Sequence, residues 1–367
     1  MNRIALFALV LVLFGVVPPL AAQTQPPIAV ALMTGFNPGA NNGMTMLNMK
    51  LQTVFGGGAP LPPFSSQVFP YTDQTGAANF LSAAGPNALR VLIGHSWGAN
   101  SNFTLAQNVL GPMGMPVALQ VSVDWVSQSN PFQATTPTVP VAIQLAYNYH
   151  QTSTTLFEPV PSNTVIGAAR NLNMETVFAD TSLIHTTVDC DERVHYLIVA
   201  RIRELFMPEP FPGTGEHLDL FCRRDVLNVA CNFGSGIVVP GVLTQDAVQT
   251  VQAGGWVTLR TLSPEGDFST KPFGILGEVF ATGATPVPVM PGIASSLTFG
   301  SLILITPGLV QAPPTMFAPL PAAGFDFSVC WPAGFAGTSV LLQTVVIDAA
   351  AQNGAYATSL GIEIRGI

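Results

Sequence analysis

The sequence predicts an α/β domain with a mostly parallel sheet, followed by an all-β sandwich domain. Between residues 26 and 206, short apolar runs alternate with segments of helical periodicity, which is typical of a parallel sheet covered by helices. Beyond residue 215, short β-type runs are separated by turns rich in Pro and Gly, with almost no helical periodicity. The 367 residues exceed what one hydrophobic core usually holds, so we expect two domains.

Several predicted strands of the first domain are apolar without interruption, as a strand buried on both faces should be. Strands are expected at residues 27–36, 65–71, 88–95, 116–126, 141–150 and 164–172. Helices are expected at residues 44–55, 75–85, 98–110 and 191–206. In the last helix Val194, Leu197, Ile198, Ile202 and Leu205 recur at helical spacing, so this helix should pack on the sheet.

A run rich in proline and glycine at residues 207–215 separates the two patterns and marks the predicted domain boundary. The α/β domain is therefore expected at residues 23–207 and the β-sandwich at residues 208–367. Strands of the second domain are expected at residues 254–262, 296–305, 324–331, 338–347 and 362–367.

The N-terminal segment has the composition of a secretory signal peptide. Arg3 precedes the run IALFALVLVLFGVV, which is about as long as a signal-peptide core and shorter than the roughly 20 residues of a membrane span. We expect residues 1–22 to be removed, although Leu20 departs from the small-residue pattern before a cut after Ala22. The sequence thus predicts a secreted protein, extracellular or periplasmic, with no transmembrane segment in its mature form.

Charged residues are scarce in this chain. They make up 9% of it, against 48% hydrophobic residues, and the net charge of -8 rests on few groups. With only 12 Lys and Arg and no basic cluster, the chain lacks the positive surface that nucleic-acid binding needs, so no nucleic-acid partner is expected. The low charge suits contact with an apolar or polymeric substrate, but secreted β-rich proteins without such a substrate share it.

The four cysteines, Cys190, Cys222, Cys231 and Cys330, fit a protein exported to an oxidising compartment. Cys222 and Cys231 are close enough in sequence to close a short loop, but four cysteines allow three pairings and the sequence does not choose among them. No pair has the spacing of metal ligands beside a pair of histidines, so we do not expect a structural zinc.

The strongest functional signal is the motif GHSWG at residues 94–98. The pattern G-x-S-x-G occurs by chance in a chain with 34 glycines, so its setting decides. An apolar strand precedes it and a helix-like segment follows it, which is the setting of a nucleophilic serine. Gly94 and Gly98 would let strand and helix approach closely, with Ser96 in a strained conformation at the helix N-terminus, where the helix dipole stabilises negative charge. The alternative is a serine in an ordinary turn.

In these residues the chain resembles the α/β-hydrolase superfamily, over roughly residues 26–206. The resemblance implies the chain order serine, acid, histidine, so the partners of Ser96 must follow it. His185 lies after the last predicted strand and before the last helix, where the family has its catalytic histidine. His150 closes a strand and His195 lies inside the last helix, so His185 is the expected base.

The expected acid is Asp124, directly after the first strand that follows the nucleophile helix, a place that some lipases use. Many members of the family place the acid one strand later, but the loop after residue 150 offers no carboxylate before Glu158. Glu158, Glu175 and Asp180 stay as alternatives. Asp189 is close to the histidine in sequence, but its place at the start of the last helix fits a capping role better.

An oxyanion hole needs two main-chain N–H donors, one from the residue after the serine and one from the loop after the first strand. Trp97 supplies the first by position, and Phe36 is the expected second, beside Gly35, which permits close approach of a substrate carbonyl. The alternative is that TGFNPG is simply a turn. Both aromatic rings would line the mouth of the site and suit acyl or aryl groups, although either could equally pack into the core.

Residues 213–221, GTGEHLDLF, and residues 338–367 resemble a C-terminal module of exported proteins from planctomycete-like bacteria. The resemblance implies no activity. Attachment to substrate or cell surface and passive stabilisation are both compatible with a β-sandwich in this place.

The sequence as a whole predicts a secreted serine hydrolase that cleaves carboxylic esters, an esterase or lipase acting on lipids or polyesters, with Ser96, His185 and Asp124 as its catalytic residues and no cofactor. Amide and thioester cleavage use the same groups and stay open, as does the oligomeric state. The alternative from another class is a non-catalytic binding or surface-attachment protein with a degenerate hydrolase domain. The complete set of serine, histidine and acid disfavours it.

Overall fold

The structure is a computed structural model that describes most of the chain beyond residue 25. The described residues are 26–36, 43–56, 62–153, 158–178, 180–206, 219–223, 243–244, 248–264, 266–284, 286–288, 293–298, 301–306, 309–311, 317–351, 354–359 and 361–367. The predicted signal peptide at residues 1–22 and the predicted domain boundary at residue 207 both lie outside this set.

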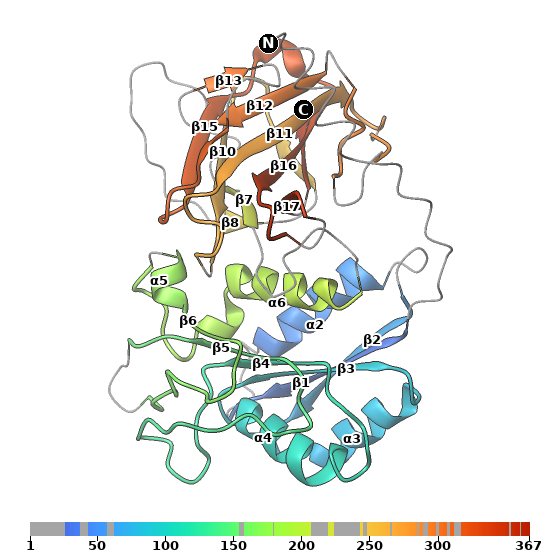
Figure 1. The fold of residues 1–367 in the computed structure, drawn as a ribbon, viewed down its shortest axis with the longest axis vertical. Coiled ribbons are helices and arrows are strands. Elements are labelled where there is room, and N and C mark those ends of the chain that lie inside the picture. Colours follow the sequence, from blue (N-terminus) through green and yellow to red (C-terminus); the bar gives the residue numbers. More distant parts are fainter. Residues whose placement is uncertain are drawn as a thin grey trace.

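The first part of the chain forms a six-stranded sheet whose neighbouring strands all run parallel, as expected (Figure 1). The strand order is β2-β1-β3-β4-β5-β6. The strands are β1 (Ile28–Thr34), β2 (Phe64–Pro70), β3 (Leu89–His95), β4 (Leu119–Val123), β5 (Ala146–His150) and β6 (Arg170–Asn173). The last three are shorter than the apolar runs predicted for them, because outside these bounds Val117 pairs with Ile143, and Ile166 with Thr138, only through isolated bridges.

Helices cover both faces of this sheet, which is why β1 is buried along its whole length. Ile28, Val30 and Leu32 face one hydrophobic cluster, which includes α2 (Gly43–Phe55) and α6 (Glu192–Glu204). The alternate residues of β1 face a second cluster, which includes α3 (Gln74–Ala83) and α4 (Trp97–Leu105). Two cores on opposite faces of one sheet are what a strand of uninterrupted apolar residues requires.

The later part of the chain is β-rich and contains two further sheets. One is antiparallel, with the order β15-β10-β7-β8. Its strands are β7 (Asp219–Arg223), β8 (Leu243–Thr244), β10 (Trp256–Leu262) and β15 (Phe325–Cys330). The other sheet is mixed. In it β9 runs parallel to β18, and the remaining strand pairs of the sheet are antiparallel. Its strands are β9 (Val248–Val251), β11 (Pro272–Ala281), β12 (Leu302–Thr306), β13 (Leu309–Gln311), β14 (Ala318–Pro319), β16 (Thr338–Ile347), β17 (Tyr356–Thr358) and β18 (Ile362–Gly366).

The two sheets of the β-rich part share one hydrophobic cluster. Val257 and Leu259 of β10 pack there with Ile275 of β11 and Leu342 of β16. The sequence analysis missed β11, although it pairs with β16 over nine residues, Phe273–Ala281. Its glycines read as turn residues, but a Cβ at Gly274 would lie 2.6 Å from Leu304 Cδ1, so this glycine makes room for a side chain of β12.

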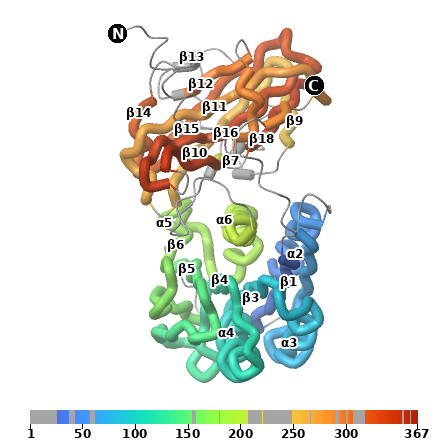
Figure 2. Tube along the Cα trace, turned by 45° about the vertical axis from the view of Figure 1, so that its right-hand side comes forward, coloured from blue at the N-terminus to red at the C-terminus, as the bar shows by residue number. Residues whose placement is uncertain are grey.

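Helices α2 and α6 lie between the parallel sheet and the β-rich part (Figures 1 and 2). The two parts touch through an apolar and a polar contact. Leu262 of β10 belongs to the hydrophobic cluster that contains α2 and α6. Arg170 of β6 forms an ion pair with Asp267, with 3.0 Å between the guanidinium nitrogen and the carboxylate oxygen.

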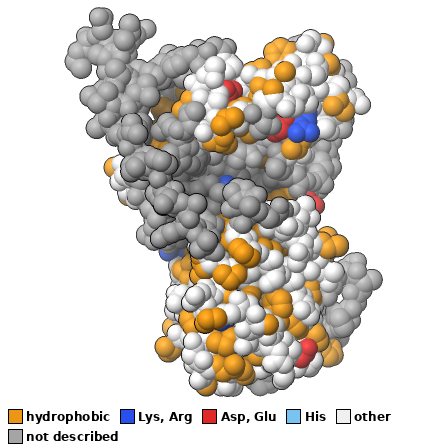
Figure 3. Space-filling view, turned by 90° about the vertical axis from the view of Figure 1, so that its right-hand side faces the viewer, with side chains coloured by type: hydrophobic (Ala, Val, Ile, Leu, Met, Phe, Trp, Pro, Cys, Tyr) orange, Lys and Arg blue, Asp and Glu red, His pale blue; other side chains and the backbone are white. Residues whose placement is uncertain are grey.

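The face of the molecule shown in Figure 3 carries few charges on its described residues, in keeping with the composition. In the face shown in Figure 3, hydrophobic and uncharged side chains cover most of the described surface of the α/β part, with only isolated acidic and basic groups. Within the part of the chain that the structure describes, we find no helix with both the length and the apolar character that crossing a membrane requires.

Candidate active site

Ser96 connects β3 to α4 in a strained turn. Its backbone has φ 56° and ψ −123°, a region that residues with a side chain rarely adopt. A Cβ at Gly94 would lie 2.6 Å from the main-chain nitrogen of Ala99, and one at Gly98 would lie 2.2 Å from the oxygen of Met33. Gly94 is therefore needed for the close approach of β3 and α4, and Gly98 for the close approach of α4 and β1.

Ser96, His185 and Asp124 come together in one chain of hydrogen bonds. Ser96 Oγ lies 3.0 Å from His185 Nε2, and His185 Nδ1 lies 3.1 Å from Asp124 Oδ2. Ser96 and His185 are each 4% exposed and Asp124 is fully buried. Since a carboxylate can only accept, Nδ1 of His185 carries the proton in this arrangement, which leaves Nε2 as the acceptor for the serine hydroxyl.

Asp124 follows directly on β4, at the edge of the sheet where Ser96 also lies. Its backbone has φ 49°, and its N–H donates to Tyr149 O at 2.7 Å. Gln151, the first residue after the neighbouring strand β5, donates to both carboxylate oxygens, from its main-chain N–H at 2.9 Å and from its side-chain amide at 3.1 Å. The buried carboxylate thus has three donors, which offsets its loss of water.

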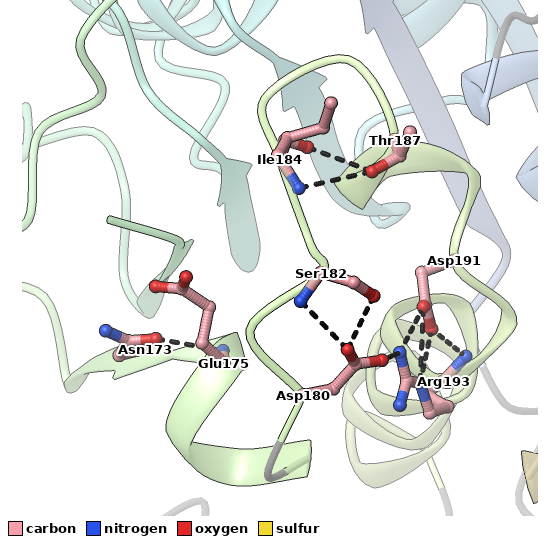
Figure 4. Close-up of polar contacts among 8 residues, drawn as sticks. All are labelled: Asn173, Glu175, Asp180, Ser182, Ile184, Thr187, Asp191 and Arg193. Atoms are coloured by element: carbon pink, nitrogen blue, oxygen red, sulfur yellow. Dashed lines mark hydrogen bonds and ion pairs between the residues drawn. The ribbon is translucent and has the colours of Figure 1, made fainter. Parts of the chain in front are cut away.

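The segment that carries His185 runs from residue 180 to α6 and is held at both ends (Figure 4). Asp180 accepts hydrogen bonds from the N–H and hydroxyl of Ser182, and Arg193 at the start of α6 bridges Asp180 and Asp191. The bonds from Ser182, followed by the Arg193 guanidinium, lower the pKa of Asp180 to about 2, against the effect of its burial. In the same segment Thr187 Oγ1 accepts from the N–H of Ile184 at 3.2 Å.

Asp189 does not cap the last helix, contrary to the sequence-based expectation. The N-cap of α6 is Asp191, whose side chain accepts from the N–H of Arg193. Asp189 lies two residues earlier, in the short 3-10 helix Val188–Cys190, and is buried, with its Oδ2 3.4 Å from Nδ1 of His95. His95, the second residue of the GHSWG motif, was not considered as a site residue, although it also contacts the segment of His185.

The other candidate acids and histidines lie away from the imidazole of His185. Glu158 accepts from Thr186 Oγ1 at 3.2 Å, and Glu175 accepts from Thr152 and Ser153. His150 ends β5 and His195 lies within α6, as expected, where its Nε2 approaches the main-chain oxygen of Asp189 at 2.6 Å. Burial lowers the pKa of both histidines.

Three aromatic rings meet beside Ser96, which we call the aromatic cluster: Phe36, Tyr71 and Trp97. The centroid of the Phe36 ring lies 4.6 Å from that of the Trp97 ring, and the centroid of the Tyr71 ring lies 5.3 Å from that of the Trp97 ring. Phe36 is 67% exposed, so it does not pack into the core. Its neighbour Gly35 packs closely on the serine, since a Cβ there would lie 2.9 Å from Ser96 Cβ. Tyr71 was missed, because nothing in its local sequence links it to the motif.

The cysteines divide into two kinds. Cys190 carries a thiol, which donates to Asp189 Oδ1 at 3.6 Å. Cys330 is disulfide-bonded. Cys231 lies outside the described residues, as does the side chain of Cys222. No group of three or more His, Cys, Asp or Glu side chains that could hold a metal ion is present among the residues that the structure describes.

Comparisons with known proteins give little. No family model matches the chain, and no curated protein matches it. Two solved structures of a beta-glucosidase from Listeria innocua, one in complex with isofagomine and a mutant in complex with laminaribiose, are similar at 10% and 9% identity with a TM-score of 0.21. The match covers 96% of this chain, and 48% and 47% of theirs, so the chain spans about half of their length. At this TM-score the likeness carries no argument about fold or function.

A hydroxyl, an imidazole and a carboxylate in this order can move a proton off the hydroxyl, because the imidazole accepts it on one nitrogen while the carboxylate stabilises the resulting cation through the other. The three groups come from the ends of β3 and β4 and from the segment before α6. They therefore depend on the parallel sheet, which brings the carboxyl ends of its strands to one edge.

Proposed function

We propose that this chain is a secreted serine hydrolase of the α/β-hydrolase superfamily that cleaves carboxylic esters. One observation carries the proposal. The hydroxyl of Ser96, on a strained turn between a strand and a helix, is hydrogen-bonded to an imidazole that is itself oriented by a buried carboxylate. This is the arrangement that activates a serine for acyl transfer.

In the proposed reaction, Ser96 Oγ attacks the carbonyl carbon of the ester while His185 Nε2 takes the hydroxyl proton. Asp124 holds the imidazole in the tautomer that has its proton on Nδ1 and stabilises the imidazolium that forms. The tetrahedral intermediate collapses with loss of the alcohol, which receives the proton from His185, and leaves an acyl group on Ser96. Water then attacks the acyl carbon while His185 takes its proton, the bond to Ser96 Oγ breaks, Oγ regains the proton from His185, and the carboxylic acid is released.

The oxyanion of each tetrahedral intermediate would be held by the main-chain N–H groups of Trp97 and Phe36. The N–H groups of the first turn of a helix have no partner within that helix, and Trp97 is the first residue of α4. The close packing of Gly35 on Ser96 supports a second donor from Phe36. The positive end of the α4 dipole adds to the stabilisation of negative charge at this place.

The aromatic cluster supports an ester with an apolar acyl or aryl group as the substrate. An exposed ring such as Phe36, packed on two further rings beside the nucleophile, offers a flat apolar surface to such a group. The sparsely charged surface supports lipid or polyester substrates over charged ones. The signal-like N-terminal segment supports secretion.

The test is covalent labelling together with ester hydrolysis. A fluorophosphonate probe should label wild-type protein at Ser96 but not Ser96→Ala. Hydrolysis of p-nitrophenyl esters from acetate to palmitate should fall by at least about 10⁴-fold in Ser96→Ala and His185→Ala. Ser129→Ala, which changes a serine outside the motif, is the matched control and should keep both activities.

A folded wild-type protein that is neither labelled nor faster than Ser96→Ala would contradict the proposal. That result would favour the alternative of a binding or surface-attachment protein. The chain-length optimum in the ester series would separate an esterase from a lipase.

A further inference from the structure

His95 makes a contact across the active site that the mechanism above does not use. It is the last residue of β3, and its Nε2 lies 2.9 Å from the main-chain oxygen of His185, 90 residues further along the chain. A carbonyl oxygen only accepts, so Nε2 of His95 carries a proton and donates it. The imidazole ring of His95 lies beside that of His185, with 4.8 Å between their centroids and 34° between their planes.

The same ring also contacts Asp189, four residues after His185 in the same segment. Oδ2 of Asp189 lies 3.4 Å from Nδ1 of His95. Asp189 is itself held, because its main-chain oxygen lies 2.6 Å from Nε2 of His195 in α6 and its Oδ1 accepts from the thiol of Cys190. One side chain from the strand of the nucleophile therefore touches both the first and the last residue of the segment 185–189.

We propose that His95 is a positioning residue for the reaction, which ties the segment of His185 to the strand of Ser96 and so sets the distance between the imidazole and the serine hydroxyl. This inference rests on the proposed function. His95 does not touch Ser96 Oγ through a hydrogen bond that the structure shows, and it acts through the main chain of His185. Proton transfer depends steeply on this distance, because a misplacement of about 1 Å costs on the order of 100-fold in rate.

The charge of His95 also matters to the reaction. The charged or titratable groups that face it are Asp189, His185 and Asp124. Burial lowers the pKa of His95, against the attraction of the two carboxylates. A lowered pKa suits this place, because His185 becomes an imidazolium in each half-reaction and a second cation, with 4.8 Å between the ring centroids, would oppose that step.

The experiment compares His95→Leu with His95→Gln. Leucine removes the donor, whereas the amide nitrogen of glutamine can take the place of Nε2 and donate to the oxygen of His185. With p-nitrophenyl butyrate, kcat should fall about 100-fold in His95→Leu with KM within about threefold of wild type, and His95→Gln should regain at least about tenfold. Gln343→Leu, which removes a buried side-chain hydrogen bond in β16 of the β-rich part, is the matched control for folding and should keep kcat.

A second readout does not need activity. The Nδ1 proton of His185, held by Asp124, should give a low-field ¹H NMR resonance in wild type and His95→Gln that is lost or broadened in His95→Leu. Equal kcat in His95→Leu and wild type, equal loss in both variants, or an unchanged resonance in His95→Leu would each overturn the inference. If wild-type protein is neither labelled nor active, the proposed function fails by itself, and the resonance still tests whether His95 positions His185.

Discussion

Gln151 donates two hydrogen bonds to Asp124, one from its main-chain N–H to Oδ1 at 2.9 Å and one from its side-chain amide to Oδ2 at 3.1 Å. The second of these oxygens also accepts from His185. Because β4 and β5 are parallel neighbours, the residues that follow them meet at one edge of the sheet. Gln151 therefore orients the carboxylate that orients the imidazole.

Replacing Gln151 by Leu should lower both the free energy of unfolding and kcat. The main-chain donor stays, but Oδ2 loses one of its two partners in a fully buried place, which costs about 1–3 kcal/mol of stability. We expect kcat for p-nitrophenyl butyrate to fall about tenfold with little change in KM. A less well oriented carboxylate stabilises the transition state less, and a loss of about 1.4 kcal/mol corresponds to this factor. Urea unfolding and steady-state kinetics measure the two effects. Gln52→Ala, which changes an exposed glutamine, is the control, and a Gln151 variant that matches it would refute this role.

Glycine at position 96 should give a more stable protein than alanine at the same position. Alanine keeps the strain of φ 56°, whereas glycine adopts this conformation without a steric penalty. After the greater entropy of glycine in the unfolded chain is subtracted, Ser96→Gly should exceed Ser96→Ala by about 1 kcal/mol in free energy of unfolding. Urea denaturation of the two variants tests this without any assay of activity. Equal stabilities would mean that the turn relaxes when the serine is replaced.

Phe36→Ala should raise KM for long or aryl esters and leave acetate esters nearly unaffected. The lost ring contact is worth about 0.5–1.5 kcal/mol, which corresponds to about 3–10-fold in KM for substrates that reach the aromatic cluster. Stability should not change, since Phe36 is 67% exposed. Phe132→Ala is the matched control, because Phe132 is 66% exposed and lies outside the cluster. A parallel change in all substrates, acetate included, would argue against a subsite for the acyl or aryl group.

Asp180→Asn should destabilise the protein at neutral pH but not at low pH. The pKa of Asp180 is lowered to about 2 by its bonds to Ser182 and Arg193, against about 3.9 in an unfolded chain. A lowered pKa contributes stability that is present above pH 4 and is lost as pH falls toward 2. Because the side chain is 29% exposed, we expect the difference at pH 7 to be about 1 kcal/mol. Urea unfolding at pH 7, 4 and 2.5 checks it, and a difference that is constant over this range would show that the charge of Asp180 does not contribute.

Cys190 should react slowly with iodoacetamide at pH 8. Burial, followed by the nearby Asp189 carboxylate, raises the pKa of its thiol to about 11, so little of the reactive thiolate is present below that pH. Mass spectrometry of the Cys190 peptide should show alkylation that is slower than that of glutathione in the same buffer and that increases up to about pH 11. Alkylation in denaturant is the control and should be fast. Fast labelling of the folded protein at pH 8 would contradict the environment described for this thiol.

The succession of strands and helices along the chain in the α/β part could be predicted from the sequence, because apolar runs and helical periodicity indicate which residues are buried. Ser96, Asp124 and His185 could be proposed from their places relative to those elements. Asp189 was assigned wrongly as a cap, because capping is a local property whereas its contact with His95 depends on packing between distant segments. The strand β11 was missed, because Gly274 and Gly277 indicate a turn unless the side chains that cross them are known.

Local sequence determined that a serine stands at a sharp turn between a buried strand and a helix, since Gly94 lets the strand approach the first turn of the helix that follows the serine. Only the tertiary structure decided which groups complete the site. Gln151 and Tyr71 reach it from the end of β5 and the turn after β2, and no pattern in their own neighbourhoods marks them. His95 stands inside the motif, but its contact with the main chain of His185 is set by packing between distant segments. Hydrogen bonds and ring contacts depend on distance in space, and the parallel sheet sets those distances by aligning the ends of strands that lie far apart in the chain.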